Sequence, residues 1–330
     1  MNWDQRVVAV TGAAGFIGSH LCKRLVDLGA TILPLDIRYR ERQPWRVLGL
    51  ENHQVNAIDM SRVDNILYWI RHETRPKPDI VFHLAGVSHI DQAQGAPLKA
   101  WSANVQTAWN LLEACRSYQI KAIVLASSNH VYGPILGERT RPYIEEDRLR
   151  ADDVYGTSKA CADLIARCYA AMGLPVASLR HVNAYGPADP HESHLVTGTI
   201  LSLLKDERPV LRSNGTPIKG YLHVDDVVNA YLLIAAGLFD DKIPRQPYNA
   251  APVLAWPALT LVDKVIQASG KDLVPDVQGT DLSQSYYREM LDPTRLSAAT
   301  GWKPAWSLEG GLKATYEWYR NNGGMAWLAE

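Results

Sequence analysis

The sequence lacks an excess of charge of either sign. It carries 34 lysines and arginines against 35 aspartates and glutamates, which gives a formal net charge of -1. A basic surface field that attracts nucleic acid is therefore excluded, and we expect no nucleic-acid partner. Any anionic ligand must be held by a few residues and by backbone groups.

The sequence also lacks a long apolar run. No stretch is long enough to span a bilayer. The first residues, "MNWDQRVVAVTG", do not combine a basic segment with a long apolar one, so we expect neither a signal peptide nor a membrane partner.

Cysteine is scarce and is not arranged for metal binding. The four cysteines form no CxxC pair and have no metal-ligand spacing. Each lies in a helix-like segment, where a buried thiol is expected. The sequence therefore predicts no metal site and a reducing, cytoplasmic location; the residues concerned are Cys22, Cys115, Cys161 and Cys168.

What the sequence does contain is an alternation of strand-like and helix-like segments. Short β-branched runs typical of buried parallel strands alternate with segments whose apolar residues recur at helical spacing. This order predicts an α/β fold with a doubly wound, Rossmann-type parallel sheet. The predicted strands are 6–12, 31–38, 79–86, 121–128, 175–186 and 246–252, and the predicted helices are 15–30, 104–119, 154–173 and 226–238.

The alternation loosens after about residue 187, where proline, glycine and tryptophan become frequent. We therefore expect a nucleotide-binding domain over residues 1–186. Residues 187–330 are expected to form mainly a smaller lobe that covers the substrate, interleaved with the last strands of the main sheet.

A glycine-rich turn follows the first predicted strand. The segment "TGAAGFIG" places Gly12, Gly15 and Gly18 between a strand and a helix. Such a turn lets the backbone approach a pyrophosphate, and the helix N-terminus supplies free N–H groups. Asp36 ends the second strand, where a carboxylate binds ribose hydroxyls and repels a 2′-phosphate. The pattern predicts NAD as the cofactor, although Arg38 lies close enough to weaken that preference.

A tyrosine and a lysine lie four residues apart in "YGTSK", on one face of a predicted helix. An ammonium beside a phenol favours the phenolate, so Tyr155 near Lys159 can act as a base near neutral pH. The segment "ASSNHVYG" (126–133) comes shortly before this pair.

Together these segments resemble the extended short-chain dehydrogenase/reductase family, in particular its nucleotide-sugar epimerases and dehydratases. The resemblance covers nearly the whole chain. It rests on eight segments in the family's order: "TGAAGFIGSHL", "HLAG", "NVQTAWNLLEA", "SSNHVYG", "YGTSKACAD", "RHVNAYGP", "GYLHVDDV" and "TGWKPAWSLEGGL". In some of these segments the residues are most similar to those of CDP-glucose 4,6-dehydratases.

The resemblance implies roles for individual residues. Ser128, Tyr155 and Lys159 would carry the redox chemistry, and Asn183 and Ser88 would contact the nucleotide-sugar. The residues expected to contact NAD are Gly12, Gly15, Phe16, Ile17, Gly18, Asp36, Arg38, Asp59, Met60, Leu84, Ala85, Gly86, Asn104, Tyr155 and Lys159.

The sequence departs from the family at three points. Lys219-Gly220 stands where relatives usually carry Arg-Asp, and Gly86 stands where alanine is usual. No residue cleanly matches the arginine that binds the diphosphate, so Arg212, Lys219 and Arg288 all remain candidates.

The pair that follows Ser128 leaves the reaction open. Related dehydratases carry an acid and a base there, because elimination needs one group to remove the C5 proton and another to help the C6 hydroxyl leave. Here the pair is Asn129 and His130; the amide cannot titrate, but the imidazole could be a base. Uronate dehydrogenases also carry Ser-Ser-Asn-His and eliminate nothing, so Asn129 could instead bind substrate.

We therefore expect an NDP-hexose 4-epimerase slightly ahead of a 4,6-dehydratase with His130 as base. A sugar dehydrogenase and a non-catalytic NAD-binding protein are further alternatives. In relatives, the two helices that begin near Asn104 and Tyr155 form a four-helix dimer interface, so a homodimer is expected. Its candidate contacts are Trp109, Leu112, Leu164 and Ile165.

Overall fold

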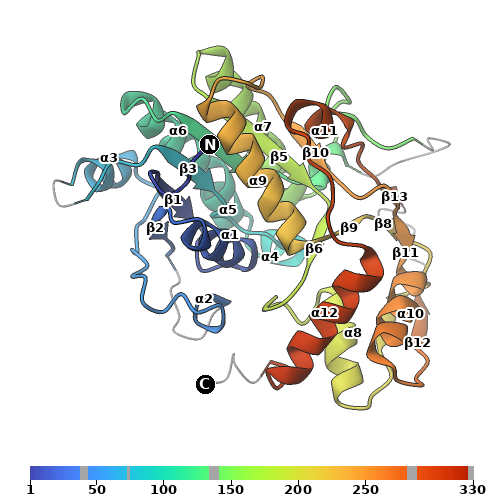
Figure 1. Cartoon of the computed structure of the whole chain (residues 1–330). Helices are drawn as coiled ribbons and strands as arrows, with labels where there is room; N and C mark the ends of the chain where they lie inside the picture. The colour runs from blue at the N-terminus through green and yellow to red at the C-terminus, as the bar shows by residue number, and fades with distance from the viewer. Residues whose placement is uncertain (38–43, 73–74, 134–140, 281–287, 326–330) are drawn as a thin grey trace.

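A six-stranded parallel sheet forms the centre of the molecule (Figure 1). The computed structural model describes residues 1–37, 44–72, 75–133, 141–280 and 288–325. The strand order is β10-β5-β4-β3-β1-β2, so the direction of winding reverses between β1 and β3. The doubly wound fold is thus confirmed. The strands are β1 (Val7–Thr11), β2 (Thr31–Leu35), β3 (Ile80–His83), β4 (Ala122–Ala126), β5 (Val176–His181) and β10 (Tyr248–Ala250).

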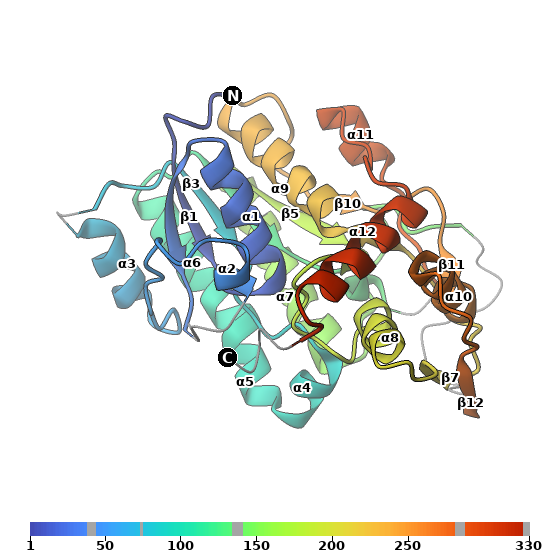
Figure 2. The ribbon, with the colours of Figure 1, turned by 60° about the horizontal axis from the view of Figure 1, so that its bottom comes forward.

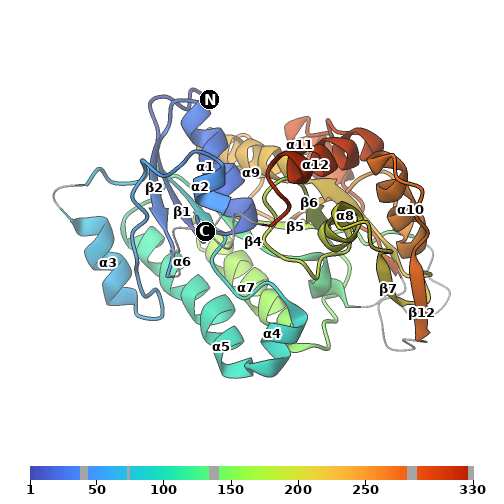
Figure 3. The same cartoon turned by 90° about the horizontal axis from the view of Figure 1, so that it is seen from below.

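Helices cover both faces of this sheet (Figure 3). Because side chains alternate along a strand, Val8 and Val10 pack in one core and Ala9 in the other. The first core contains α1 (Phe16–Asp27) and α9 (Val224–Phe239); the second contains α3 (Val63–Arg71), α6 (Thr107–Ser117) and α7 (Val154–Ala171).

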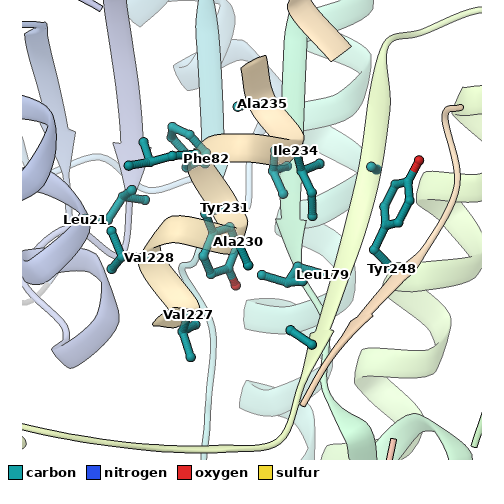
Figure 4. Packing of buried hydrophobic residues seen from close by; sticks show 14 of the residues in the cluster. Leu21, Phe82, Leu179, Val227, Val228, Ala230, Tyr231, Ile234, Ala235 and Tyr248 are labelled. Atoms are coloured by element: carbon teal, nitrogen blue, oxygen red, sulfur yellow. The ribbon is translucent and has the colours of Figure 1, made fainter. Parts of the chain in front are cut away.

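Helix α9 and strand β10 follow residue 187 in the chain but belong to the main sheet layer. Figure 4 shows Val227, Tyr231 and Ile234 of α9 directed at the strands, where the Tyr231 ring meets Phe82 edge-on at 6.2 Å between ring centroids. The predicted strand at 246–252 is confirmed, since β10 pairs with β5. The division at residue 187 stays a prediction, and its second part contributes both elements to the first layer.

The predicted strand at 175–186 is wrong in one respect, because it is two strands. β5 ends at His181, and the N–H of Val182 donates to the Ala250 carbonyl. The chain then leaves the sheet as β6 (Asn183–Tyr185), which pairs with β9 (Tyr221–His223). This exit directs residue 183 toward the second part of the chain.

Three helices form a separate hydrophobic core beside the sheet (Figure 2). They are α8 (Leu195–Leu204), α10 (Ala258–Ser269) and α12 (Leu308–Asn321). Small sheets line this lobe: β7 (Val210–Ser213) with β12 (Asp276–Thr280), and β8 (Ile218–Lys219) between β11 (Trp256–Pro257) and β13 (Arg288–Glu289). The remaining elements are α2 (Pro44–Val47), α4 (Ile90–Gly95), α5 (Pro97–Trp101), a π-helical segment (Ser102–Gln106), a 3-10 helix (Asn129–Tyr132) and α11 (Thr294–Thr300).

Helices α6 and α7 lie side by side and carry the residues proposed for a dimer interface (Figure 3). Trp109 is 45% exposed and Leu164 is 51% exposed. Ile165 is only partly buried, whereas Leu112 is fully buried in the core of its own chain. Leu112 is therefore a core residue and is not available to a second copy.

The expectation of buried thiols holds for half of the cysteines. Cys22 and Cys115 are buried, Cys161 is half-buried and Cys168 is exposed. The expectation was wrong for Cys168 because this position of α7 faces solvent. Among the helices that the structure describes, none is long and apolar enough to cross a membrane.

Candidate active site

The glycine-rich turn after β1 packs so closely that side chains do not fit. Gly12 has a φ of +68°, and a Cβ there would lie 2.7 Å from the Ala85 nitrogen. A Cβ on Gly18 would overlap the Gly12 carbonyl. Helix α1 begins at Phe16, and its N-cap residue is Gly15, which has no side chain that could cap the helix. The turn therefore presents bare backbone at a helix N-terminus, which fits a dinucleotide pyrophosphate.

The carboxylate of Asp36 lies beside this turn. Its Oδ2 accepts the N–H of Ala14 at 3.2 Å, so the end of β2 and the turn are held together. This placement fits a carboxylate that meets the ribose hydroxyls. Arg38, the residue expected to weaken that preference, lies outside the described residues.

Asp59 and Met60 lie at the same edge of the sheet. A parallel bridge between Leu35 and Asn56 brings this loop alongside β2. Asp59 Oδ1 accepts the Ser61 N–H at 2.9 Å, and hydrogen bonds from Ser61 lower the pKa of the exposed Asp59 carboxyl. Met60 is buried. Both residues are placed near the expected adenine end of the site.

The "HLAG" segment, at the end of β3, lies beside the glycine-rich turn, where the direction of winding of the sheet reverses. The Leu84 N–H donates to the Thr11 carbonyl at 3.1 Å, and the Ala85 N–H donates to Thr11 Oγ1 at 3.2 Å. His83 Nδ1 lies 2.8 Å from the same hydroxyl, and burial lowers the pKa of His83 to about 3, so its ring is neutral. Ligands of open α/β sheets bind at such a switch point.

The Asn104 amide lies directly beside Gly86. Asn104 lies in the π-helical segment and is buried; its Oδ1 accepts the Val87 N–H at 2.8 Å and its Nδ2 donates to Ser158 Oγ at 2.8 Å. A Cβ on Gly86 would overlap this Oδ1. The amide is therefore held in the space that an alanine methyl group would take.

Ser128, Tyr155 and Lys159 come together at the carboxyl end of β4. Burial raises the pKa of the Tyr155 phenol, and a hydrogen bond with Ser128 acts against that rise. Lys159 Nζ donates to the Ala126 carbonyl at 3.0 Å, and burial lowers the pKa of Lys159 to about 8. The ring of His130 meets the Tyr155 ring edge-on, with 5.5 Å between centroids. This arrangement brings a phenol, an ammonium and a hydroxyl together, which are groups that general acid–base catalysis uses.

Asn129 is joined to a residue that sequence reasoning missed. Its Nδ2 donates to Glu289 Oε2 at 2.9 Å, and its Oδ1 lies 3.3 Å from Ser128 Oγ. Glu289 is 5% exposed, and its Oε1 lies 2.9 Å from Lys219 Nζ. Burial opposes ionisation of Glu289, but the charges of Lys219 and His130 leave its pKa below the usual value. A carboxylate from the lobe therefore reaches the segment at residues 126–133.

A second buried pair, which the sequence analysis also missed, fixes the segment at residues 126–133. Arg180 on β5 donates to both carboxylate oxygens of Asp163 on α7, at 2.9 and 2.7 Å, and both side chains are fully buried. Arg180 Nη1 also donates to the Tyr132 hydroxyl at 2.7 Å. Tyr132 ends the short helix that begins at Asn129. The pair thus fixes this helix against α7 and the sheet.

The expected substrate-binding residues fall into two groups. Asn183 Nδ2 donates to the Gly220 carbonyl at 3.2 Å, beside Lys219, and the register of β13 on β8 places Arg288 opposite Ile218. Arg212 and Ser88 are both exposed and lie elsewhere. Arg212 is on β7, which pairs with β12 in a different sheet, and Ser88 follows the "HLAG" segment. Of the three basic candidates for the diphosphate, Lys219 is paired with Glu289, and all three stay predictions.

The known proteins that are similar to this chain include nucleotide-sugar epimerases and dehydratases. A family model described as the NAD dependent epimerase/dehydratase family matches residues 8–251. The chain is 30% identical to a probable dTDP-glucose 4,6-dehydratase of Sinorhizobium fredii, over 96% of this chain and 93% of that protein. It is 26% identical to a probable UDP-glucuronate 4-epimerase of Rhizobium meliloti, over 95% and 96%. The solved UDP-glucose 4-epimerase of Thermus thermophilus, in complex with NAD, matches with a TM-score of 0.81 at 28% identity, over 95% and 99% of the two chains.

Proposed function

The chain belongs to the NAD-dependent epimerase/dehydratase family, and from that membership we propose that it epimerises a nucleotide-linked hexose at C4. It is an enzyme and its cofactor is NAD. The bare glycine turn at the start of α1 and the adjacent Asp36 carboxylate fit that cofactor.

In the proposed reaction, NAD held by the glycine turn and Asp36 would supply the hydride chemistry at C4. Tyr155 takes the proton of the C4 hydroxyl and later gives it back, and Ser128 hydrogen-bonds the reacting oxygen. Lys159, fixed on the Ala126 carbonyl, orients the cofactor and favours the phenolate. General acid–base catalysis of this kind contributes roughly 10²–10⁴-fold in rate.

One observation favours epimerisation over elimination. Residue 129 is an amide where related dehydratases carry an acid, and its two polar atoms already face Glu289 and Ser128. An amide that cannot titrate does not protonate a departing C6 hydroxyl. Oxidation at C4 needs only the three residues that the fold brings together.

A 4,6-dehydratase is the second candidate, and His130 supports it. Its ring meets Tyr155 edge-on, and its charge acts on the buried Glu289. One imidazole and one carboxylate beside the Ser128 segment support an elimination, which needs a base at C5 and an acid at C6. The two candidate reactions differ in whether the C5 proton of the sugar is removed.

A panel of UDP-, dTDP-, CDP- and GDP-hexoses in heavy water separates the two candidates. An epimerase returns the original hydride, so the product should keep the substrate's mass, carry no deuterium and differ only in retention. A product lighter by one water, with deuterium at C5, would overturn the proposal and make His130 the base. In that case His130→Ala should oxidise C4, stop before elimination and accumulate reduced nicotinamide.

We also propose a cytoplasmic homodimer that binds no nucleic acid. Trp109 and Leu164 lie on adjacent helices and are both exposed, which supports the dimer because exposed large apolar side chains are typical of an interface. The balanced charge of the chain gives nucleic acid no attractive field.

A further inference from the structure

Glu289 contacts Asn129, the residue that follows Ser128. It lies on β13, which pairs with β8 so that Glu289 stands opposite Lys219. The Gly220 N–H donates to the Glu289 carbonyl at 3.2 Å, so the backbone at this position is fixed. The carboxylate is almost fully buried, and a buried charge is stable only when it is paired and hydrogen-bonded.

The contact with Glu289 decides how the Asn129 amide is oriented. The two ends of an amide side chain look alike in shape, and only their partners tell them apart. An ionised carboxylate accepts hydrogen bonds and donates none, so Asn129 must direct Nδ2 at Glu289. Its Oδ1 then faces Ser128 Oγ, which is the observed arrangement.

We propose that Glu289 is a positioning residue of the active site, which holds the Asn129 amide oxygen toward Ser128 and, with Lys219, sets the electrostatic environment of Tyr155. The inference rests on the proposed oxidation at C4. It assigns Glu289 no contact with the substrate, and it gives the Glu289–Lys219 pair the task of linking the lobe to the catalytic serine.

Several charged or titratable groups surround the Tyr155 phenol. Lys159 lies one turn further along α7, Asp153 caps that helix, and His130 lies on the adjacent short helix. Burial raises the pKa of Tyr155 and of Tyr221, and the negative charge of Glu289 adds to the rise in both. Removal of that charge should therefore make the Tyr155 phenolate easier to form.

The test titrates Tyr155 directly in protein saturated with NAD and free of sugar. Tyrosine labelled with 13C at Cζ reports each phenol by NMR, and Tyr155→Phe identifies the signal. Glu289→Gln should move the Tyr155 titration to lower pH, because it removes a negative charge and keeps the shape of the side chain. Lys219→Met should move it to higher pH, because it leaves the Glu289 charge uncompensated.

Steady-state kinetics give a second readout on the substrate found in the panel. Loss of the Asn129 orientation should lower kcat on the order of 10²-fold in Glu289→Ala with little change in KM, since misplacement of a reacting group costs about that much. Glu145→Gln is the matched control. Glu145 is buried like Glu289 and accepts the Asn249 N–H at 2.8 Å, and it is not among the charges that shift the pKa of Tyr155. It should leave both the titration and kcat unchanged.

The outcomes separate this inference from the proposed function. An unmoved Tyr155 signal in both Glu289→Gln and Lys219→Met would overturn the inference, even if their thermal stability fell. Should Glu289→Gln not fold, the upward shift in Lys219→Met decides alone. Opposite shifts in a protein that turns over no nucleotide-hexose would retain the inference about Glu289 and refute the proposed reaction.

Discussion

Replacement of Asp163 by asparagine should destabilise the protein more than almost any other single isosteric change. Asp163 and Arg180 are both fully buried, and the guanidinium donates to both carboxylate oxygens. Asparagine preserves the shape of the side chain but leaves the Arg180 charge without its counter-ion. Breaking a buried pair in this way costs about 3–5 kcal/mol.

That free energy converts into a measurable change of melting temperature. Unfolding entropy is about 2.1 cal/mol/K per residue near 60 °C, so a chain of 330 residues changes its unfolding free energy by roughly 0.7 kcal/mol for each degree. We therefore expect Asp163→Asn to lower Tm by about 4–7 °C. Calorimetry and circular dichroism on the same sample give the change and check that the transition is cooperative.

Two further variants test the cause. Asp163→Leu combined with Arg180→Met removes both charges, and it should recover much of the loss because an apolar replacement of a buried pair is often neutral. Glu113→Gln is the control: it breaks the pair with Arg116 on the exposed surface of α6 and should barely move Tm. The reasoning about the buried charge would be refuted if Asp163→Asn had the same Tm as the wild type. It would also be refuted if the double variant had a lower Tm than Asp163→Asn.

Three other predictions concern the site and the assembly. Tyr155→Phe should keep the fold and NAD binding but lose on the order of 10² or more in kcat, the scale of general-base catalysis; near-normal turnover would remove Tyr155 from the mechanism. Calorimetric titration of cofactor-stripped protein should give tighter binding of NAD than of NADP, because Asp36 repels a 2′-phosphate; equal binding would contradict the role of that carboxylate. Light scattering should give a dimer mass at micromolar concentrations and a monomer mass for Trp109→Glu with Leu164→Glu, and a monomeric wild type would refute the dimer.

The sequence predicted those parts of the fold that local patterns determine. Short apolar runs rich in β-branched residues located five of the six strands of the main sheet, because such residues suit a strand buried on both faces. The sixth, β10, has no β-branched residue and was expected only as one of the last strands of the sheet. The spacing of Tyr155 and Lys159 placed both on one face of α7, since four residues make about one helical turn. Gly12 and Gly18 marked the turn because their positions leave no room for a Cβ.

Contacts between residues that are far apart in the chain could not be predicted from a local sequence pattern. Glu289 meets Asn129 across 160 residues of chain, and no repeat or spacing in the sequence relates the two. The break at Val182 depends on a hydrogen bond to Ala250, which only the assembled sheet provides. The exposure of Cys168 depends on which helices cover α7. Each of these is decided by tertiary packing rather than by the residue's neighbours in sequence.

The distance along the chain between Asn129 and Glu289 has a consequence for synthesis. A ribosome that adds about 5–20 residues per second makes Glu289 roughly 8–32 s after Asn129. Strand β10, which completes the main sheet, is made before β13. The nascent chain therefore contains every residue expected to contact NAD before it contains the carboxylate that orients Asn129.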